Sequence, residues 1–218
     1  MSEPTGFLYP FIEEEERDLG ALQGDLVQSA SAKIELSHSL RAETVRACAP
    51  VIRAAGEAMA ERFDHGGRLF FMGNGGSATD AQGAARLFNH PPQGRPLPAV
   101  SLVDDPAILT ALANDIGFDL VFARQVAAYG KDGDMVVGFS TSGESANLLR
   151  AFEEAERRQL LTVGLAGYSG GAMAGNPAVA HLLLVRSDSV HRIQEAQSAL
   201  IRELWATVQH HLGQTGRP

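Results

Sequence analysis

Residues 68–77 have the sequence RLFFMGNGGS, in which an apolar run leads directly into a glycine-rich turn. The run is continuous rather than alternating, as in a strand that is buried on both faces of a sheet. The turn, Gly73-Asn74-Gly75-Gly76-Ser77, precedes a helix-length segment at Ala78–Phe88. A strand, a tight turn and a helix in this order predict the start of an α/β fold.

Four further apolar runs follow, and helix-length segments separate them. This alternation predicts a parallel sheet with right-handed crossovers and helices on both faces. We therefore expect a three-layer αβα sandwich around a five-stranded parallel sheet, with additional N-terminal helices. The expected strands are Arg68–Met72, Pro98–Val103, Met135–Phe139, Leu161–Leu165 and His181–Val185, and the expected helices after Ala78–Phe88 are Ala107–Ala113, Phe118–Ala128, Ser145–Arg157 and Val190–Leu212.

The chain before Gly66 shows no strand signal. Apolar residues recur there at helical spacing, which predicts two or three helices over Phe11–Arg62, with Pro50 near a helix start or kink. The expected organisation is a flexible lead-in at 1–10, packing or oligomerisation helices at 11–65, the α/β domain at 66–212 and a tail at 213–218.

Composition excludes several classes of protein. The chain has 218 residues, a formal net charge of −8 and one cysteine, Cys48. One cysteine forms no intrachain disulfide and no thiolate zinc site, and an acidic chain disfavours broad nucleic-acid binding. We see no membrane span and no signal peptide, so we expect a protein of the reducing cytoplasm.

A hydroxyl-rich loop, Ser140-Thr141-Ser142-Gly143-Glu144-Ser145, follows the third expected strand. The free amides at a helix N-terminus, together with the helix dipole, favour an anion, and hydroxyls add donors for phosphate oxygens. The loop contains no lysine and no nucleotide-triphosphatase signature. It therefore predicts a cradle for a phosphate monoester, although a simple helix-capping cluster is an alternative.

The glycine turn after the first strand also predicts a ligand, because glycine lets a backbone approach closely. Alternatively it is only a tight turn capped by Ser77. Its Gly73-x-Gly75-x-x-Ala78 spacing matches the dinucleotide fingerprint, with Asp104 or Asp105 as the ribose-binding acid about 30 residues on. A dinucleotide-binding protein is therefore a remote alternative.

Several short motifs follow one another along the chain. Because they occur in this order, the chain resembles the sugar isomerase (SIS) domain proteins of the phosphoheptose isomerase type. The resemblance runs from about residue 40 to 210. The motifs that carry it are Gly73-Asn74-Gly75-Gly76-Ser77 with Asp80-Ala81-Gln82, Ala113-Asn114-Asp115, Phe122-Ala123-Arg124-Gln125, Ser140-Thr141-Ser142-Gly143 and Arg192-Ile193-Gln194-Glu195.

The resemblance implies a homotetramer with active sites at subunit interfaces, acting on sedoheptulose 7-phosphate. It implies a phosphate held by Ser140, Thr141, Ser142 and Ser145. The residues that it places at the sugar are Asn74, Gly75, Ser77, Asp105 and, near the reacting end, Gln194.

The departures from the family pattern concern the zinc and proton-transfer residues. Where the family has its first His, its Glu and its second His, this chain has Gly83, Leu87 and Arg202. Where the family has a basic residue four positions after the Glu, this chain has Pro91. An aldose–ketose isomerase needs an acid and a base at the substrate, and a zinc ion needs His and carboxylate ligands. We therefore expect no cofactor and no metal. The remaining candidates for a rearranged catalytic site are Glu195, Gln194, His191 and Asp105, with His90 near in sequence.

Two functions from different classes follow. One is an isomerase of a sugar phosphate that works through a divergent site. The other is a non-catalytic protein that senses a sugar phosphate or binds a protein partner, since the resembled family includes a relative that binds the bacterial replication initiator. Arg202 could neutralise the phosphate or another acidic ligand without transferring a proton. Alternatively it is a solvent-facing helix residue that pairs with Glu203 or with a neighbouring subunit.

Overall fold

A five-stranded parallel sheet with the order β2-β1-β3-β4-β5 forms the centre of the protein. The computed structural model describes residues 19–214, so the expected lead-in at 1–10 and the end of the expected tail lie outside the described residues. The chain divides into two compact units, residues 1–39 and 40–218. The strands are β1 (Leu69–Gly73), β2 (Ala99–Ser101), β3 (Met135–Ser140), β4 (Leu161–Gly167) and β5 (His181–Val185).

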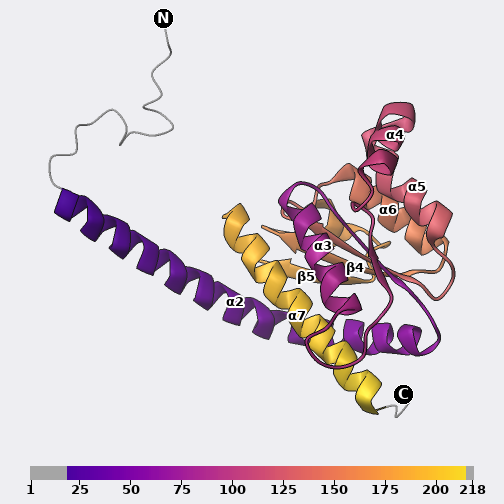
Figure 1. Ribbon diagram of the computed structural model, residues 1–218, viewed down its shortest axis with the longest axis horizontal. Coiled ribbons are helices and arrows are strands. Elements are labelled where there is room, and N and C mark those ends of the chain that lie inside the picture. Colours follow the sequence, from indigo (N-terminus) through magenta and orange to yellow (C-terminus); the bar gives the residue numbers. More distant parts are fainter. Residues whose placement is uncertain (1–18, 215–218) are drawn as a thin grey trace, which may run out of the picture. The chain divides into compact units, whose positions relative to one another are not determined.

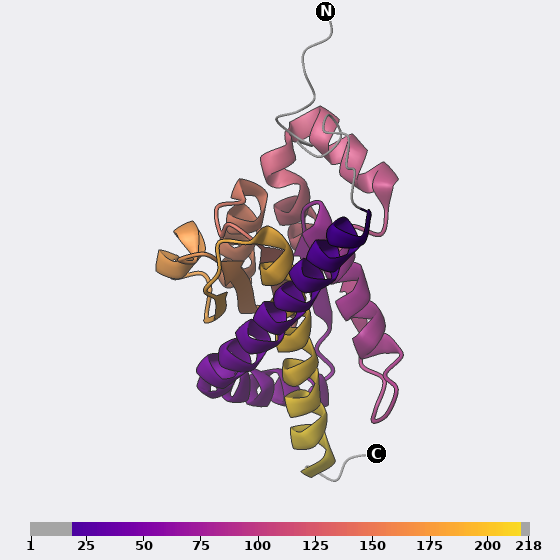
Figure 2. The ribbon, with the colours of Figure 1, turned by 90° about the vertical axis from the view of Figure 1, so that its left-hand side faces the viewer.

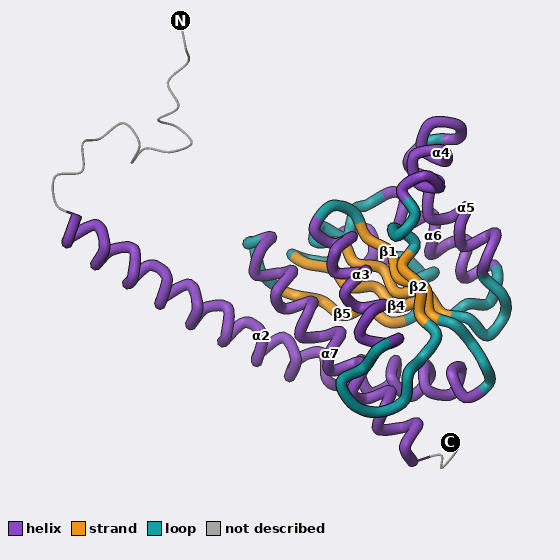
Figure 3. The backbone as a smooth tube through the Cα atoms, in the orientation of Figure 1, coloured by secondary structure: helices purple, strands orange, loops and turns teal. Residues whose placement is uncertain are grey.

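Helices cover both faces of this sheet (Figure 1). Figure 3 shows the strands as a central layer between the helices. The helices are α2 (Leu19–Asp64), α3 (Gly76–Asn89), α4 (Pro106–Ile116), α5 (Val121–Tyr129), α6 (Ala146–Arg157) and α7 (Val190–Gln214), with short 3-10 turns at Phe118–Leu120 and Gly171–Gly175.

Two apolar cores separate the layers. One joins the sheet to α3, α7 and the part of α2 after residue 40, and includes Phe71, Phe88 and Leu204. The other joins the sheet to α5 and α6, and includes Phe122 and Phe152. Every residue of β1, β3 and β4 is buried, which explains why these strands are continuously apolar. The three-layer prediction is confirmed.

The expected second strand is shorter in the structure. Pro98–Val103 contains only the three residues of β2, which is an edge strand paired with β1. Pro98 has no amide to donate to a ladder, and the chain turns after Ser101. The other expected strands and helices lie within a few residues of their predicted bounds.

The expectation of two or three N-terminal helices is wrong for the described residues. From residue 19 onward the chain forms one helix of 46 residues, and Pro50 lies inside it. Proline removes one helical hydrogen bond. The helix nevertheless continues through Pro50, and buried residues on both sides of it, Cys48 and Ile52, belong to the same core. No helix of the described residues has the length and apolar character that a membrane span needs.

The strand order places a topological switch point between β1 and β3. From β1 the chain moves to β2 on one side, and from β3 it moves to β4 and β5 on the other. Gly73 at the end of β1 pairs with Phe139 in β3. The two loops singled out in the sequence therefore leave the sheet side by side, where open α/β sheets form their ligand crevice.

Candidate functional site

The hydroxyl-rich loop after β3 is held by its own serines. The Oγ of Ser140, a residue that is only 3% exposed, lies 3.0 Å from the Ser145 Oγ and accepts a 3.0 Å hydrogen bond from the Gly143 amide. The Ser142 Oγ lies 3.5 Å from the Ser140 Oγ and accepts a 3.1 Å bond from the Glu144 amide. Three serine hydroxyls therefore lie close together in this segment. We call residues 140–145 the serine loop.

Ser145 occupies the N-cap position of α6, yet its side chain makes no capping hydrogen bond. The simple capping alternative therefore fails for this residue, because its hydroxyl is directed to Ser140 instead. The first amides of the 12-residue helix α6 have no side-chain cap. Together with the hydroxyls they form the donor set that a dianionic phosphate requires.

The loop needs glycine at one position. Gly143 has φ of 72°, and a Cβ there would lie 2.0 Å from the carbonyl oxygen of Gly170. On the same side, the Glu144 Oε1 accepts a 2.9 Å hydrogen bond from the Ala172 amide. The backbone turn and this bond fix the serine loop against the 3-10 turn at Gly171–Gly175.

A reciprocal pair of amides connects the two loops. The Asn74 Nδ2 donates to the Asn147 Oδ1, and the Asn147 Nδ2 donates to the Asn74 Oδ1, both over 2.9 Å. Asn147 is buried and Asn74 is half-buried. The glycine turn after β1 is thereby fixed to the first turn of α6.

A cavity of about 170 Å³ lies between α3 and α7 and reaches Phe139, the residue before the serine loop. The two helices pack against each other (Figure 1 and Figure 2). Gly83, Leu87 and Arg202, the residues at the departures from the family pattern, all line this cavity, which we call the α3–α7 cavity. A Cβ at Gly83 would meet no atom within 4 Å, so the cavity is open at this position.

Asp80 also lines the α3–α7 cavity. Its Oδ2 is buried and has no hydrogen-bond partner among the described residues. Burial raises the pKa of the Asp80 carboxyl, and a hydrogen bond with Ser198 opposes that shift. The Oδ2 of Asp80 therefore has a free acceptor position at the edge of the cavity.

The candidates for a rearranged catalytic site do not meet in this cavity. The residues that line it include neither His90, His191, Gln194 nor Glu195. His90, His191 and Glu195 are exposed. Gln194 lies instead against the start of α3, where a Cβ added to Gly76 would be 2.2 Å from its Nε2.

Asp105 caps helix α4. Its Oδ1 accepts hydrogen bonds from the amides of Ala107, at 2.9 Å, and Ile108, at 3.1 Å. A dinucleotide-binding protein would need an acidic side chain here to bind the ribose hydroxyls of the cofactor. Because the Asp105 carboxylate already accepts hydrogen bonds from the helix, the dinucleotide alternative is weakened. The roles of Asp105, Ser77 and Gly75 at a sugar, and of Thr141 at the phosphate, stay predictions.

The residues present do not form a zinc site. Within residues 19–214 no group of three or more His, Cys, Asp or Glu side chains is close enough to hold a metal ion. The α3–α7 cavity offers Asp80 as its one carboxylate, and no histidine lines it. Its other polar side chains are the hydroxyls of Thr79 and Ser198 and the guanidinium of Arg202. None of these three groups is a usual zinc ligand.

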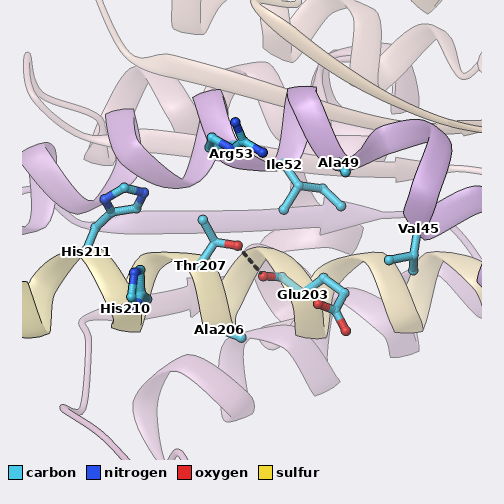
Figure 4. A pocket seen from close by; sticks show the side chains of 9 residues that line it. All are labelled: Val45, Ala49, Ile52, Arg53, Glu203, Ala206, Thr207, His210 and His211. Atoms are coloured by element: carbon cyan, nitrogen blue, oxygen red, sulfur yellow. Dashed lines mark hydrogen bonds between the residues drawn. The ribbon is translucent and has the colours of Figure 1, made fainter.

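A larger groove of about 500 Å³ lies between α2 and α7 (Figure 4). Arg53 and Ile52 line it from α2, and His210 and His211 line it from α7. The Thr207 hydroxyl within it donates to the Glu203 carbonyl oxygen over 2.8 Å. None of the residues that the sequence predicts for a site lines this groove.

Comparison with known proteins fits this arrangement. The sequence profile of the SIS domain matches residues 35–167. A phosphoheptose isomerase of Roseiflexus sp. is 44% identical over 165 residues, which are 75% of this chain and 83% of the relative. The structure of a phosphoheptose isomerase from Francisella tularensis is 34% identical and superposes with a TM-score of 0.79, covering 84% of this chain and 98% of the other. The structure of phosphoheptose isomerase GmhA from Neisseria gonorrhoeae is 36% identical and superposes with a TM-score of 0.77, covering 85% of this chain and 99% of the other.

The match to the SIS domain profile covers more than half of the chain, so this is a SIS domain protein. The chain belongs to the phosphoheptose isomerase family of SIS domain proteins.

Sequence reasoning missed some residues of the site. Asn147 was not predicted, although an asparagine in the first turn of a helix beside a hydroxyl cluster is itself a polar signal. Asp80 belongs to the Asp80-Ala81-Gln82 motif, but neither it nor Ser198 carries a sequence signal that points to a cavity. All three depend on which helix face points to a neighbour, and only the packed structure determines this.

The amide pair predicts an energetic coupling between the two loops. Replacing Asn74 or Asn147 with Ala should each lower the free energy of unfolding by about 1–3 kcal/mol, because the partner is left without its hydrogen bonds. A double-mutant cycle measured by urea unfolding should give a coupling energy of about 1 kcal/mol or more. As a matched control, the exposed Arg150–Glu153 ion pair on α6 should couple by less than about 0.5 kcal/mol. Additive costs at Asn74 and Asn147 would contradict the account.

Proposed function

We propose that this protein binds a phosphorylated sugar, with the phosphate on the serine loop and the N-terminus of α6. The observation that carries the proposal is the uncapped α6 with its cluster of hydroxyls around Ser140. Membership of the phosphoheptose isomerase family supports a sugar phosphate of the sedoheptulose 7-phosphate type. The site needs no basic side chain for the phosphate, because amides and the helix dipole supply the positive potential.

Of the two functional classes, the site favours binding without isomerisation. An isomerase must move a proton between two carbons of the substrate, with an acid or base in reach of the substrate. In the α3–α7 cavity Gly83 and Leu87 have no group that exchanges a proton, and a guanidinium such as that of Arg202 stays protonated. Asp80 is the one carboxyl there, and its Oδ2 is buried.

We also propose a homotetramer in the cytoplasm, as the family resemblance implies. Large apolar side chains of α2 support self-association, since Leu26, Val27, Ile34 and Leu36 are each more than half exposed. The single cysteine, Cys48, supports a reducing compartment. A protein partner is a further possibility within the same class of function.

Removing hydroxyls tests the phosphate cradle. Ser142→Ala and Ser145→Ala should each weaken binding of sedoheptulose 7-phosphate by about 1–3 kcal/mol, because a hydrogen bond to a charged phosphate is lost. Isothermal titration calorimetry measures the change. Ser31→Ala, at an exposed position of α2, is the control and should leave the affinity unchanged. Unchanged affinity in both loop variants would show that the phosphate binds elsewhere.

A turnover assay tests the absence of isomerisation. In a coupled assay with sedoheptulose 7-phosphate, with and without added zinc, the protein should stay far below the roughly 1 s⁻¹ of an ordinary enzyme. The triple variant Gly83→His, Leu87→Glu, Arg202→His is the informative comparison, since Gly83 has open space for a side chain. Turnover by the unmodified protein would establish a divergent isomerase and overturn the non-catalytic proposal.

A further inference from the structure

Two glutamines near the start of α7 reach the two loops of the site. Gln194 and Gln197 lie on one face of the helix, because residues three apart in a helix are neighbours. Gln194 lies against the glycine turn at Gly76. The Gln197 Nε2 donates a hydrogen bond to the carbonyl oxygen of Ser140 over 3.4 Å. The same face of α7 therefore contacts both loops, and Gln197 contacts the first residue of the serine loop.

Ser140 is the residue around which the serine loop is arranged. Its Oγ accepts from the Gly143 amide and lies within hydrogen-bond distance of the Ser142 and Ser145 hydroxyls. Ser140 is also the last residue of β3, and the register with β1 ends one residue before it, so no residue of β1 lies opposite Ser140. Its carbonyl accepts a hydrogen bond from α7 instead. A shift of this carbonyl would move the hydroxyl of the same residue and the groups that gather around it.

Gln197 occupies a position where packing alone favours an apolar side chain. It is 0% exposed, and its buried neighbours on the same face of α7 are Ile193, Leu200 and Leu204. Its Oε1 is buried and has no hydrogen-bond partner among residues 19–214. A buried polar atom without a partner lowers stability, and an apolar side chain of the same length would avoid that cost. Residues that break a packing rule in this way are characteristic of functional sites.

We propose that Gln197 is a positioning residue of the phosphate site. Its amide holds the Ser140 carbonyl and thereby sets the place of the Ser140 hydroxyl, around which the hydroxyls of Ser142 and Ser145 gather. The inference rests on the proposed function, because it takes the phosphate to lie on the serine loop. Gln197 is wholly buried, so it acts on the affinity through Ser140 and not by contact with the ligand.

Gln197→Met tests the proposal, because methionine has a similar length and fills the space without a hydrogen-bond donor. Isothermal titration calorimetry of the full chain should show that this variant binds sedoheptulose 7-phosphate about fivefold more weakly or worse. The reason is that the donors of the serine loop no longer meet the phosphate oxygens at their best distances. An affinity equal to that of the unmodified protein would overturn the inference.

A double-mutant cycle with Ser140→Ala separates positioning from a general loss of stability. Ser140→Ala keeps the carbonyl that Gln197 contacts and removes the hydroxyl that Gln197 positions. On this background Gln197→Met should change the affinity by less than about twofold, because the effects of residues that act through one another are not additive. Ser142→Ala takes its place in the cycle if Ser140→Ala binds too weakly to titrate. Losses that multiply in the double variant would identify a merely structural role and overturn the inference.

Thr162→Val is the matched control. Thr162 is also buried, and its Oγ1 donates to the Ala178 carbonyl oxygen over 2.6 Å and accepts from the Ala180 amide over 2.9 Å. It lies near the start of β4, whereas the serine loop follows the end of β3. Its loss should therefore leave the affinity for sedoheptulose 7-phosphate unchanged. A loss as large as that of Gln197→Met would show that any missing buried hydrogen bond weakens binding, and would overturn the inference.

The same titrations distinguish failure of this inference from failure of the proposed function. If Ser142→Ala weakens binding and Gln197→Met does not, the phosphate site stands and the inference alone fails. If the unmodified protein does not bind sedoheptulose 7-phosphate, or if no variant of the serine loop changes the affinity, the proposed function fails and the inference fails with it.

Discussion

The pairing of β1 with β3 is the constraint on which the site depends. These strands are neighbours in the sheet although more than sixty residues separate them in the chain, and the register places Gly73 beside Phe139. Only this pairing brings the glycine turn next to the serine loop and allows Asn74 to meet Asn147. Both strands are buried throughout, so a slip by one residue would exchange the side chains that pack into the two cores.

Charge acts locally in this protein. A formal charge of −8 suggests poor affinity for an anionic ligand, yet the phosphate site that we propose consists of neutral hydroxyls and backbone amides at the start of α6. The helix dipole provides a positive potential that net charge does not describe.

The parts of the structure that depend on local sequence could be predicted. The buried strands are continuous apolar runs, and the serine loop directly follows one of them, so both were evident from the residues alone. The helix α2 was not predicted as one element, because the rule against proline is local, whereas the packing of Cys48 and Ile52 on either side of Pro50 is not. Asp80 and Ser198 were missed for a related reason: they line a cavity only because α3 and α7 pack against each other.

The position of a bound phosphate tests the central claim most directly. A crystal structure of the protein with sedoheptulose 7-phosphate locates the phosphate without assumptions about affinity or turnover. We predict phosphate oxygens within hydrogen-bond distance of the Ser142 and Ser145 hydroxyls and the first amides of α6. A phosphate in the groove between α2 and α7, or anywhere away from the serine loop, would contradict the account.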